Sequence, residues 1–217
     1  MSIEQARYNM IEQQIRPWEV LDQGVLSLLA VVKREDFVPP ACRALAFFDT
    51  EVPLPEGQAM LAPKVEARLL QALHVARHER VLEIGTGSGH MAALLAHRAQ
   101  HVTSLEIRPT LAALATANLR HAGIANASVI ATDGSRGLPA EAPFDVIVLS
   151  GSVAEVPQAL LDQLKPGGRL VAVVGDQPVM RATLVTRVAA TQFKSDVLFD
   201  TVAPRLEGFA EPALFRF

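Results

Sequence analysis

Apolar residues between positions 79 and 174 fall into short runs separated by stretches with helical spacing. The runs lie at residues 81–84, 101–107, 128–132, 144–149 and 170–174. Strands that alternate with helices in this way are typical of a doubly wound α/β sheet with parallel strands. Two further β-rich runs, 182–189 and 193–202, follow with no helix between them, so we expect them to form an antiparallel end of the sheet. The pattern therefore predicts a mostly parallel, seven-stranded sheet.

The first 78 residues lack this alternation. Residues 3–15 and 23–32 have the spacing of helices, and Asp22 is suited to cap the second of them. Residues 33–63 are rich in proline and acidic residues and show little periodicity, which predicts an ordered loop region. A helix resumes at residues 64–73. We expect the first two helices to form a lid packed on the front of the sheet, and the loop region to cover the site and to be its most mobile part.

Composition and charge narrow the class of protein. The chain has 217 residues, 50% of them hydrophobic, enough for a substantial core in one domain. We expect residues 1–217 to form that domain, with the helical lid and loop in 1–78 and the ligand-binding sheet in 79–217. The formal net charge of −3 does not favour nucleic acid as a partner. The N-terminal residues lack the apolar region of a signal peptide, and the longest apolar run near the start is too short to span a membrane. We therefore predict a cytoplasmic protein, a monomer or weak dimer, that binds neither nucleic acid nor membranes.

Metal and disulfide chemistry find no support in the sequence. Cys42 is the only cysteine, which excludes an internal disulfide and a metal site with several thiolates. The six histidines are scattered and show no metal-ligand spacing. We therefore expect no metal site.

The most informative segment follows the first predicted strand of the sheet. Residues 83–90 read Glu-Ile-Gly-Thr-Gly-Ser-Gly-His, a glycine loop that opens a helix. Glycines let the backbone approach a ligand closely, and the unpaired N–H groups of a helix start favour a nucleotide-like ligand. A dinucleotide fingerprint needs its third glycine one place later, at His90, so the spacing favours another adenosyl ligand over NAD. A purely structural tight turn is the alternative.

Polar side chains end the next strands of the predicted sheet. Because the carboxyl ends of parallel strands meet at one edge, these side chains are expected to line the same site. Glu106 lies about twenty residues beyond the glycine loop, where a carboxylate can accept hydrogen bonds from both hydroxyls of a ribose. Asp133, followed by Gly134, could accept a hydrogen bond from an adenine amino group, although Asp-Gly is also an ordinary turn pair. Ser150 follows the next run.

In order along the chain, the motifs at 83–89, Glu106, 133–134 and 164–168 resemble those of class I methyltransferases that use S-adenosylmethionine. Within that superfamily the chain most resembles the protein-L-isoaspartate O-methyltransferase family. Further matching segments cover nearly the whole chain and lie at residues 7–15, 34–39, 54–58, 156–164 and 197–200. The resemblance implies a Rossmann-like fold, S-adenosylmethionine as the methyl donor and a protein or peptide as the acceptor.

The resemblance also implies the chemistry and the site. The reaction would be methyl transfer to a protein carboxylate, as in the repair of isoaspartyl residues. A carboxylate is ionised at neutral pH, so the acceptor needs no general base. The implied cofactor-binding residues are Glu83, Gly85, Thr86, Gly87, Ser88, Gly89, His90, Glu106, Ile107, Asp133, Gly134 and Ser150.

The chain departs from the family where the acceptor is expected to bind. After Gly-Gln the family reads Thr-Ile-Ser, whereas this chain has Ala59, Met60 and Leu61. In the family that serine lies beside the transferred methyl group, and Leu61 cannot take its role. A lost hydrogen bond in a dry site is worth about 1–3 kcal/mol. This leaves open a different acceptor, a small molecule included, or a non-catalytic cofactor-binding relative. Lys64, on the first turn of the next helix, is a candidate to pair with the acceptor carboxylate, and a solvated surface lysine is the alternative.

Overall fold

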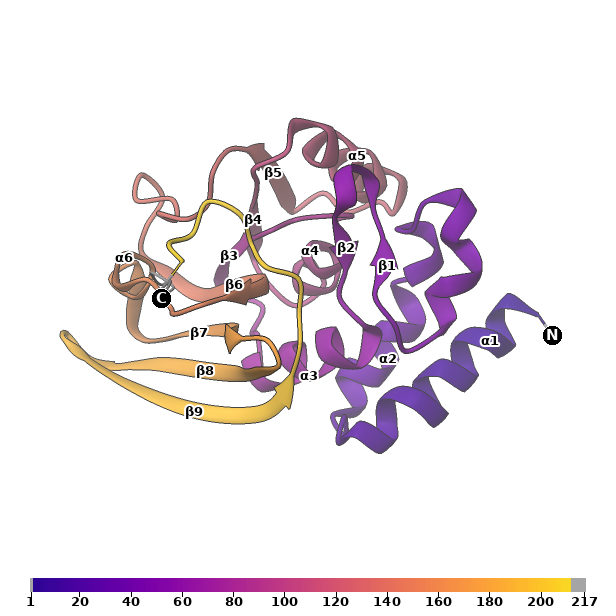
Figure 1. Ribbon diagram of the computed structural model, residues 1–217, viewed down its shortest axis with the longest axis horizontal. Coiled ribbons are helices and arrows are strands. Elements are labelled where there is room, and N and C mark those ends of the chain that lie inside the picture. The colour runs from indigo at the N-terminus through magenta and orange to yellow at the C-terminus, as the bar shows by residue number, and fades with distance from the viewer. Residues whose placement is uncertain (1, 212–217) are drawn as a thin grey trace, which may run out of the picture.

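A seven-stranded sheet organises the protein, whose computed structural model describes residues 2–211 (Figure 1). The strands lie side by side in the order β5-β4-β3-β6-β7-β8-β9. Their bounds are β3 (Arg80–Ile84), β4 (His101–Glu106), β5 (Ala127–Ala131), β6 (Phe144–Val153), β7 (Leu164–Asp176), β8 (Val179–Ala189) and β9 (Gln192–Thr201). Strands β3 to β7 are parallel, whereas β8 is antiparallel to both β7 and β9. The prediction of a mostly parallel sheet with an antiparallel end is confirmed.

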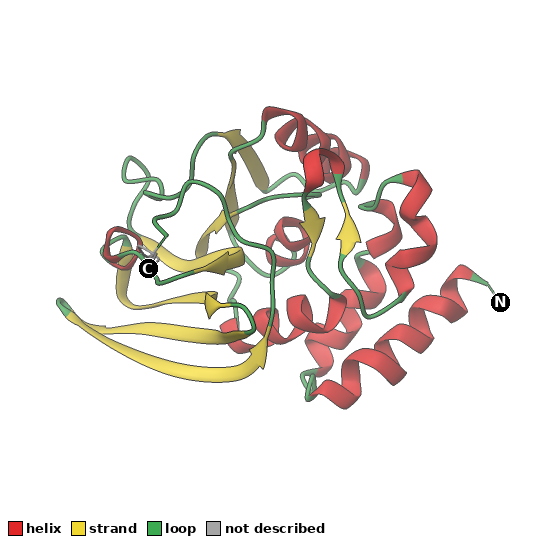
Figure 2. Ribbon diagram, in the orientation of Figure 1, coloured by secondary structure: helices red, strands yellow, loops and turns green. Residues whose placement is uncertain are grey.

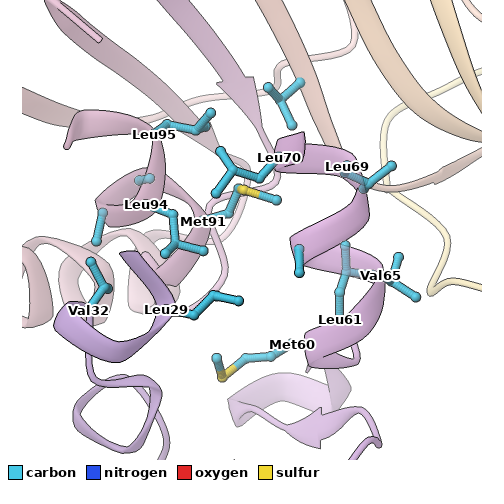
Figure 3. Packing of buried hydrophobic residues seen from close by; sticks show 14 of the residues in the cluster. Leu29, Val32, Met60, Leu61, Val65, Leu69, Leu70, Met91, Leu94 and Leu95 are labelled. Atoms are coloured by element: carbon cyan, nitrogen blue, oxygen red, sulfur yellow. The ribbon is translucent and has the colours of Figure 1, made fainter. Parts of the chain in front are cut away.

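The two faces of the sheet are covered differently. Side chains alternate between the faces along a strand. One apolar cluster therefore contains Val81, Val146 and Val148, and the other contains Leu82, Ile84, Ile147 and Leu149. The helices α3 (Pro63–Leu73), α4 (His90–Ala96) and α5 (Pro109–His121) contribute to the first cluster. Figure 3 shows Leu70 of α3 beside Met91 and Leu95 of α4. The second cluster takes in α6 (Gln158–Leu161) and the segment after β9, so helices lie on both faces, as a doubly wound sheet requires.

The N-terminal helices form a layer outside this sandwich. α1 (Ile3–Asn9) continues into a π-helix, η1 (Met10–Ile15), and a short 3-10 helix, η2 (Arg16–Trp18), before α2 (Gln23–Val31). Asp22 caps α2, as predicted, by accepting a hydrogen bond from the N–H of Val25 at 3.0 Å. Placing this lid on the front of the sheet was wrong, because η1 and α2 pack against α3, away from the strands (Figures 1 and 2). The apolar side chains of α3 and α4 already occupy the face of the sheet, so the lid covers these helices instead. The shared apolar cluster supports the expected single domain.

The segment predicted as a loop region contains short regular elements. Three 3-10 helices, η3 (Arg34–Asp36), η4 (Pro40–Phe47) and η5 (Pro55–Gly57), accompany the antiparallel pair β1 (Val52–Pro53) and β2 (Ala59–Met60). Proline is compatible with the start of a 3-10 turn, which explains how a proline-rich segment satisfies its backbone groups. We call residues 52–60 the 52–60 hairpin. A Cβ atom at Gly87 would lie 3.3 Å from Leu54 Cδ1, so this hairpin covers the glycine loop.

Within residues 2–211, the helices are too short or too polar to cross a lipid bilayer.

Candidate functional site

A pocket opens where the parallel strands β3 and β4 end, at the edge that the sequence predicted. Its empty volume is about 560 Å³. Four segments form its walls: the glycine loop, the end of β4 with the start of α5, the 52–60 hairpin, and residues 204–209. The predicted residues that line it are Gly85, Gly87, Glu106, Ile107, Gly134 and Ser150.

The glycine loop and Glu106 are built onto each other. Gly85, Gly87 and Gly89 have φ angles of 90°, 55° and 85°, which residues with a side chain rarely adopt. The N–H of Gly87 donates to Glu106 Oε2 at 2.8 Å, and the N–H of Arg108 donates to Oε1 at 3.0 Å. Each carboxylate oxygen has further accepting capacity, so Glu106 can still bind two hydroxyls of a ligand. The backbone thus fixes the one carboxylate that the sequence assigned to a ribose.

Glu83 lies beneath the pocket and is fully buried. Its Oε1 accepts a hydrogen bond from Ser150 Oγ at 2.7 Å, and its Oε2 accepts one from Ser104 Oγ at 2.6 Å. Thr86 Oγ1 lies 2.6 Å from the same Ser104 hydroxyl. Burial raises the pKa of Glu83 to about 7, although the two serine hydroxyls act in the opposite direction. Glu83 and Thr86 therefore support the pocket from below, and Ser150 is the member of this group that lines it.

The position of Ser150 differs from the prediction. We expected the strand to end at residue 149, but β6 continues to Val153. The register of β6 against β7 shifts between Val148 and Ser152, so Ser150 lies within an irregular stretch of the strand. This irregularity is what lets a residue of a central strand take part in the pocket wall.

Two predicted residues of the glycine loop anchor it to α5, and Asp133, after β5, forms a turn of its own. The carbonyl of Ser88 accepts a hydrogen bond from Asn118 Nδ2 at 2.9 Å, which anchors the loop to α5. A Cβ atom at Gly89 would lie 3.2 Å from Ala115 Cβ, so α5 packs closely there. Asp133 Oδ1 accepts the N–H of Ser135 at 2.8 Å, the arrangement of an Asp-Gly turn.

His90 lies outside the pocket wall, as do Glu83, Thr86, Ser88, Gly89 and Asp133 of the predicted set. Its side chain is 2% exposed and points into the layer of α3 and the lid. The ring packs edge-on against Phe37, with ring centroids 5.3 Å apart, and Nδ1 lies 3.0 Å from Glu66 Oε2. A buried carboxylate thus holds the ring away from the pocket, and contact of His90 with cofactor or acceptor stays a prediction.

The divergent acceptor positions also separate in the structure. Ala59 and its neighbour Gln58 line the pocket. Leu61 is 4% exposed and belongs to the apolar cluster between α3 and α4, with Met60 and Val65 (Figure 3). Leu61 is thus part of the hydrophobic core. Lys64 Nζ lies 2.7 Å from Asp49 Oδ2 and 3.8 Å from the ring centroid of Trp18. Lys64 is thus a partly exposed, paired lysine, and a role in acceptor binding stays a prediction.

Sequence reasoning missed residues 204–209, the segment that follows β9. A Cβ atom at Gly85 would lie 2.6 Å from Leu206 Cδ2, so Leu206 packs directly on the glycine loop. Arg108 donates to Glu56 Oε2 at 2.7 Å and also pairs with Glu207. These ion pairs tie the segment to the 52–60 hairpin across the pocket mouth. No local motif marked this segment, because only the topology brings residues after the last strand to this edge.

In the part of the chain that the structure describes, residues 2–211, no group of three His, Cys, Asp or Glu side chains is arranged to hold a metal ion.

Comparison with known proteins gives one consistent family. The family model of protein-L-isoaspartate(D-aspartate) O-methyltransferase matches residues 5–203. A protein-L-isoaspartate O-methyltransferase of Koribacter versatilis is 42% identical over 194 residues, 89% of this chain and 87% of the relative. Another, from Rhodopseudomonas palustris, is 42% identical over 207 residues, 94% of this chain and 95% of the relative. A Plasmodium falciparum beta-aspartate methyltransferase solved with S-adenosyl-L-homocysteine is 21% identical, has a TM-score of 0.79, and the match covers 93% of this chain and 98% of that one. The structural similarity confirms the predicted Rossmann-like fold.

Proposed function

This chain belongs to the protein-L-isoaspartate(D-aspartate) O-methyltransferase family and is an S-adenosylmethionine-dependent methyltransferase, and we propose that it methylates the free carboxylate of isoaspartyl residues in proteins or peptides. The observation that carries the proposal is the composition of the pocket. Gly87 and Glu106 form one part of its wall, and Gln58 and Ala59 of the 52–60 hairpin form another. A donor held by the first pair would thus lie next to an acceptor held by the second.

The residues present suit an adenosyl ligand. We propose that Glu106 binds the ribose hydroxyls and that Gly85 and Gly87 allow close approach of the ligand. Asp133 keeps its second oxygen for an adenine amino group, because only Oδ1 has a backbone partner among the described residues. Leu206 would cover the bound molecule from the C-terminal side.

Methyl transfer makes modest chemical demands on the protein. S-adenosylmethionine supplies a methyl group on a positively charged sulfur, which is already a strong electrophile. A carboxylate oxygen forms the new O–CH3 bond as the S–CH3 bond breaks, and the electron pair of that bond stays on sulfur. No proton moves, so the side chains around the pocket have only to orient the carboxylate in line and exclude water. Because a carboxylate acceptor is already ionised at neutral pH, none of the proposed residue roles includes a general base.

The replacement of the family's Thr-Ile-Ser predicts slow turnover of isoaspartyl peptides. An anionic acceptor beside Ala59 loses solvation and gains no hydroxyl hydrogen bond in return. An acceptor that needs no hydroxyl at this position is the alternative, and the 42–44% identity to protein-L-isoaspartate O-methyltransferases over most of the chain does not favour it. The acceptor is therefore the part of the proposal that most needs measurement.

Two measurements test the proposal together. Methyl transfer from S-adenosylmethionine is followed with an isoaspartyl peptide and with the same peptide containing an ordinary aspartyl residue. Binding of S-adenosylhomocysteine is measured by titration calorimetry. Methylation of the isoaspartyl peptide alone supports the proposal. Binding without methylation of either peptide would overturn the isoaspartyl acceptor and leave another acceptor or a non-catalytic cofactor-binding relative, and absence of binding would remove the assigned cofactor site.

A further inference from the structure

A buried network of charges lies behind the 52–60 hairpin, outside the pocket. Arg34 of η3 pairs with Glu66 Oε2 on the first turn of α3, and its Nη2 donates to the carbonyl of Leu61 at 2.7 Å. His90, the first residue of α4, shares the same Glu66 oxygen through Nδ1 at 3.0 Å. Arg34, Glu66 and His90 are 2%, 4% and 2% exposed. Three segments that are far apart in the sequence are thereby tied together.

The chemistry of the three groups fixes their roles. A carboxylate only accepts hydrogen bonds, so Nδ1 of His90 carries a hydrogen and donates a hydrogen bond to Glu66. Arg34 Nη1 also lies 3.4 Å from that nitrogen, but two donors cannot bond to each other, so Glu66 is the common partner of both. The second guanidinium nitrogen, Nη2, is then left for the backbone of Leu61. In this arrangement Glu66 and His90 orient Arg34, and Arg34 holds Leu61.

Stability alone does not explain such a network. Removing charges from water is costly, and apolar residues of similar size are often as stabilising as a buried ion pair. What the network supplies is a fixed geometry between two halves of the site. Leu61 directly follows β2 of the hairpin that lines the pocket, whereas His90 directly follows the glycine loop. A neighbouring buried pair, Arg7 with Glu35, holds η3 against α1 and so fixes the main chain at Arg34.

We propose that Arg34 is a positioning residue for acceptor binding. Glu66 and His90 orient Arg34, and Arg34 sets the distance between the 52–60 hairpin and the glycine loop through the carbonyl of Leu61. The proposal rests on the proposed function for its substrate, an isoaspartyl peptide. It predicts that the network acts on acceptor binding and leaves cofactor binding unchanged, because the glycine loop and Glu106 are held by backbone contacts of their own.

The chain offers a matched control for the experiment. Arg169 also pairs with a carboxylate, Glu79, at 2.7 Å and donates to a backbone carbonyl of α3, that of Leu73, at 2.5 Å. This second network lies at the other end of α3, away from the pocket. Glu66→Gln and Glu79→Gln therefore remove the same charge from the same kind of contact in two places.

The test combines kinetics with two readouts that do not depend on the acceptor. For Glu66→Gln we expect the KM for an isoaspartyl peptide to rise about tenfold, with Kd for S-adenosylhomocysteine within about twofold of the original. Hydrogen exchange of the 52–60 hairpin should become faster in this variant, whereas Glu79→Gln should change neither KM nor hairpin exchange. A parallel rise in KM and faster hairpin exchange for both variants, or an equal loss of cofactor affinity in Glu66→Gln, would overturn the proposal.

A second pair of variants covers the case in which Glu66→Gln does not fold. His90→Asn keeps an N–H donor near the position of Nδ1, whereas His90→Leu removes it at similar size. We expect His90→Leu to raise the KM about fivefold and to loosen the hairpin, and His90→Asn to restore both. Identical behaviour of the two variants would contradict the inferred role. If the unmodified protein does not methylate the peptide, the proposed function fails, and hydrogen exchange alone decides whether the network positions the hairpin.

Discussion

Two buried glutamates, one on each side of the site, have pKa values that are shifted in opposite directions. Glu83 lies under the cofactor side and has only hydroxyl partners, Ser104 and Ser150, so burial raises its pKa to about 7. Glu66 lies behind the acceptor side. Burial also pushes its pKa upward, but the interactions with His90 and Arg34 outweigh this and leave the pKa below its usual value. Equal burial thus raises the pKa of one carboxyl and leaves that of the other lowered, because the partners decide which form is stable.

The comparison extends to how the two regions are built. On the cofactor side, backbone N–H groups hold Glu106, and the hydroxyls of Ser104 and Ser150 on the neighbouring strands hold Glu83. On the acceptor side, side chains separated by 28 and 32 positions, as in Arg7 with Glu35 and Arg34 with Glu66, hold the segments together. A site held by backbone hydrogen bonds tolerates substitution of surface side chains. A buried charge, in contrast, is stable only while each of its partners is present.

The sharpest contrast is expected in stability. Glu66→Gln leaves the guanidinium of Arg34 buried without its counter-charge, and we expect it to lower the free energy of unfolding by about 3–5 kcal/mol. Glu83→Gln at pH 6 should change it much less, because the carboxyl is already mostly protonated there. Urea denaturation of both variants measures the difference. Equal losses would show that burial, and not the partner's charge, governs both sites.

The pH dependence of stability provides a second test. The folded-state pKa of Glu83 is raised from 4.5 to about 7, so the folded state binds more protons than the unfolded state between these values. The resulting stabilisation is fully present below pH 4.5 and is lost as the pH rises through 7. Its full extent is about 3 kcal/mol, and Glu83→Gln should abolish this component. Unfolding free energies measured from pH 5 to pH 8 would reveal it, and identical slopes for the two proteins would refute the assignment.

A smaller effect is expected when Glu106 is changed. Glu106→Ala removes the carboxylate assigned to the ribose and also the acceptor of the Gly87 N–H, so binding of S-adenosylhomocysteine should weaken by about 1–3 kcal/mol. Glu141→Ala, which changes a half-exposed glutamate bonded to Thr103 on the same strand, serves as the control. Calorimetry that finds the same affinity in Glu106→Ala and the unmodified protein would remove Glu106 from the site.

The smallest effect concerns Lys64. Its ion pair with Asp49 and its contact with Trp18 are partly exposed, so Lys64→Ala should lower stability by at most about 1 kcal/mol. If Lys64 also pairs with the acceptor carboxylate, carboxyl methylation falls severalfold while cofactor affinity stays constant. Steady-state kinetics beside calorimetry separates the two effects. Unchanged methylation would leave Lys64 with its structural contacts only.

The cofactor side could be predicted because its signals are local. Gly85, Gly87 and Gly89 mark a loop, and Glu106 ends the next strand, so periodicity and spacing were enough to bring them to one edge of the sheet. The order in which strands and helices alternate also determined the parallel sheet and its antiparallel end. α5 likewise begins at Pro109 and ends just before Gly123, residue types that are typical of a helix start and of the position past a helix end.

The acceptor side was decided by the tertiary structure. Leu61 and His90 are neighbours of the site in sequence, yet packing turns one into a core residue and the other into a partner of Glu66. Residues 204–209 carry no motif and reach the pocket only because β8 and β9 return the chain to that edge. Hydrophobic periodicity and turn chemistry act over a few residues, and a sequence displays them directly. Contacts between buried charges join distant segments. They form only in the folded state, where burial removes water as a competing hydrogen-bond partner of the charged groups.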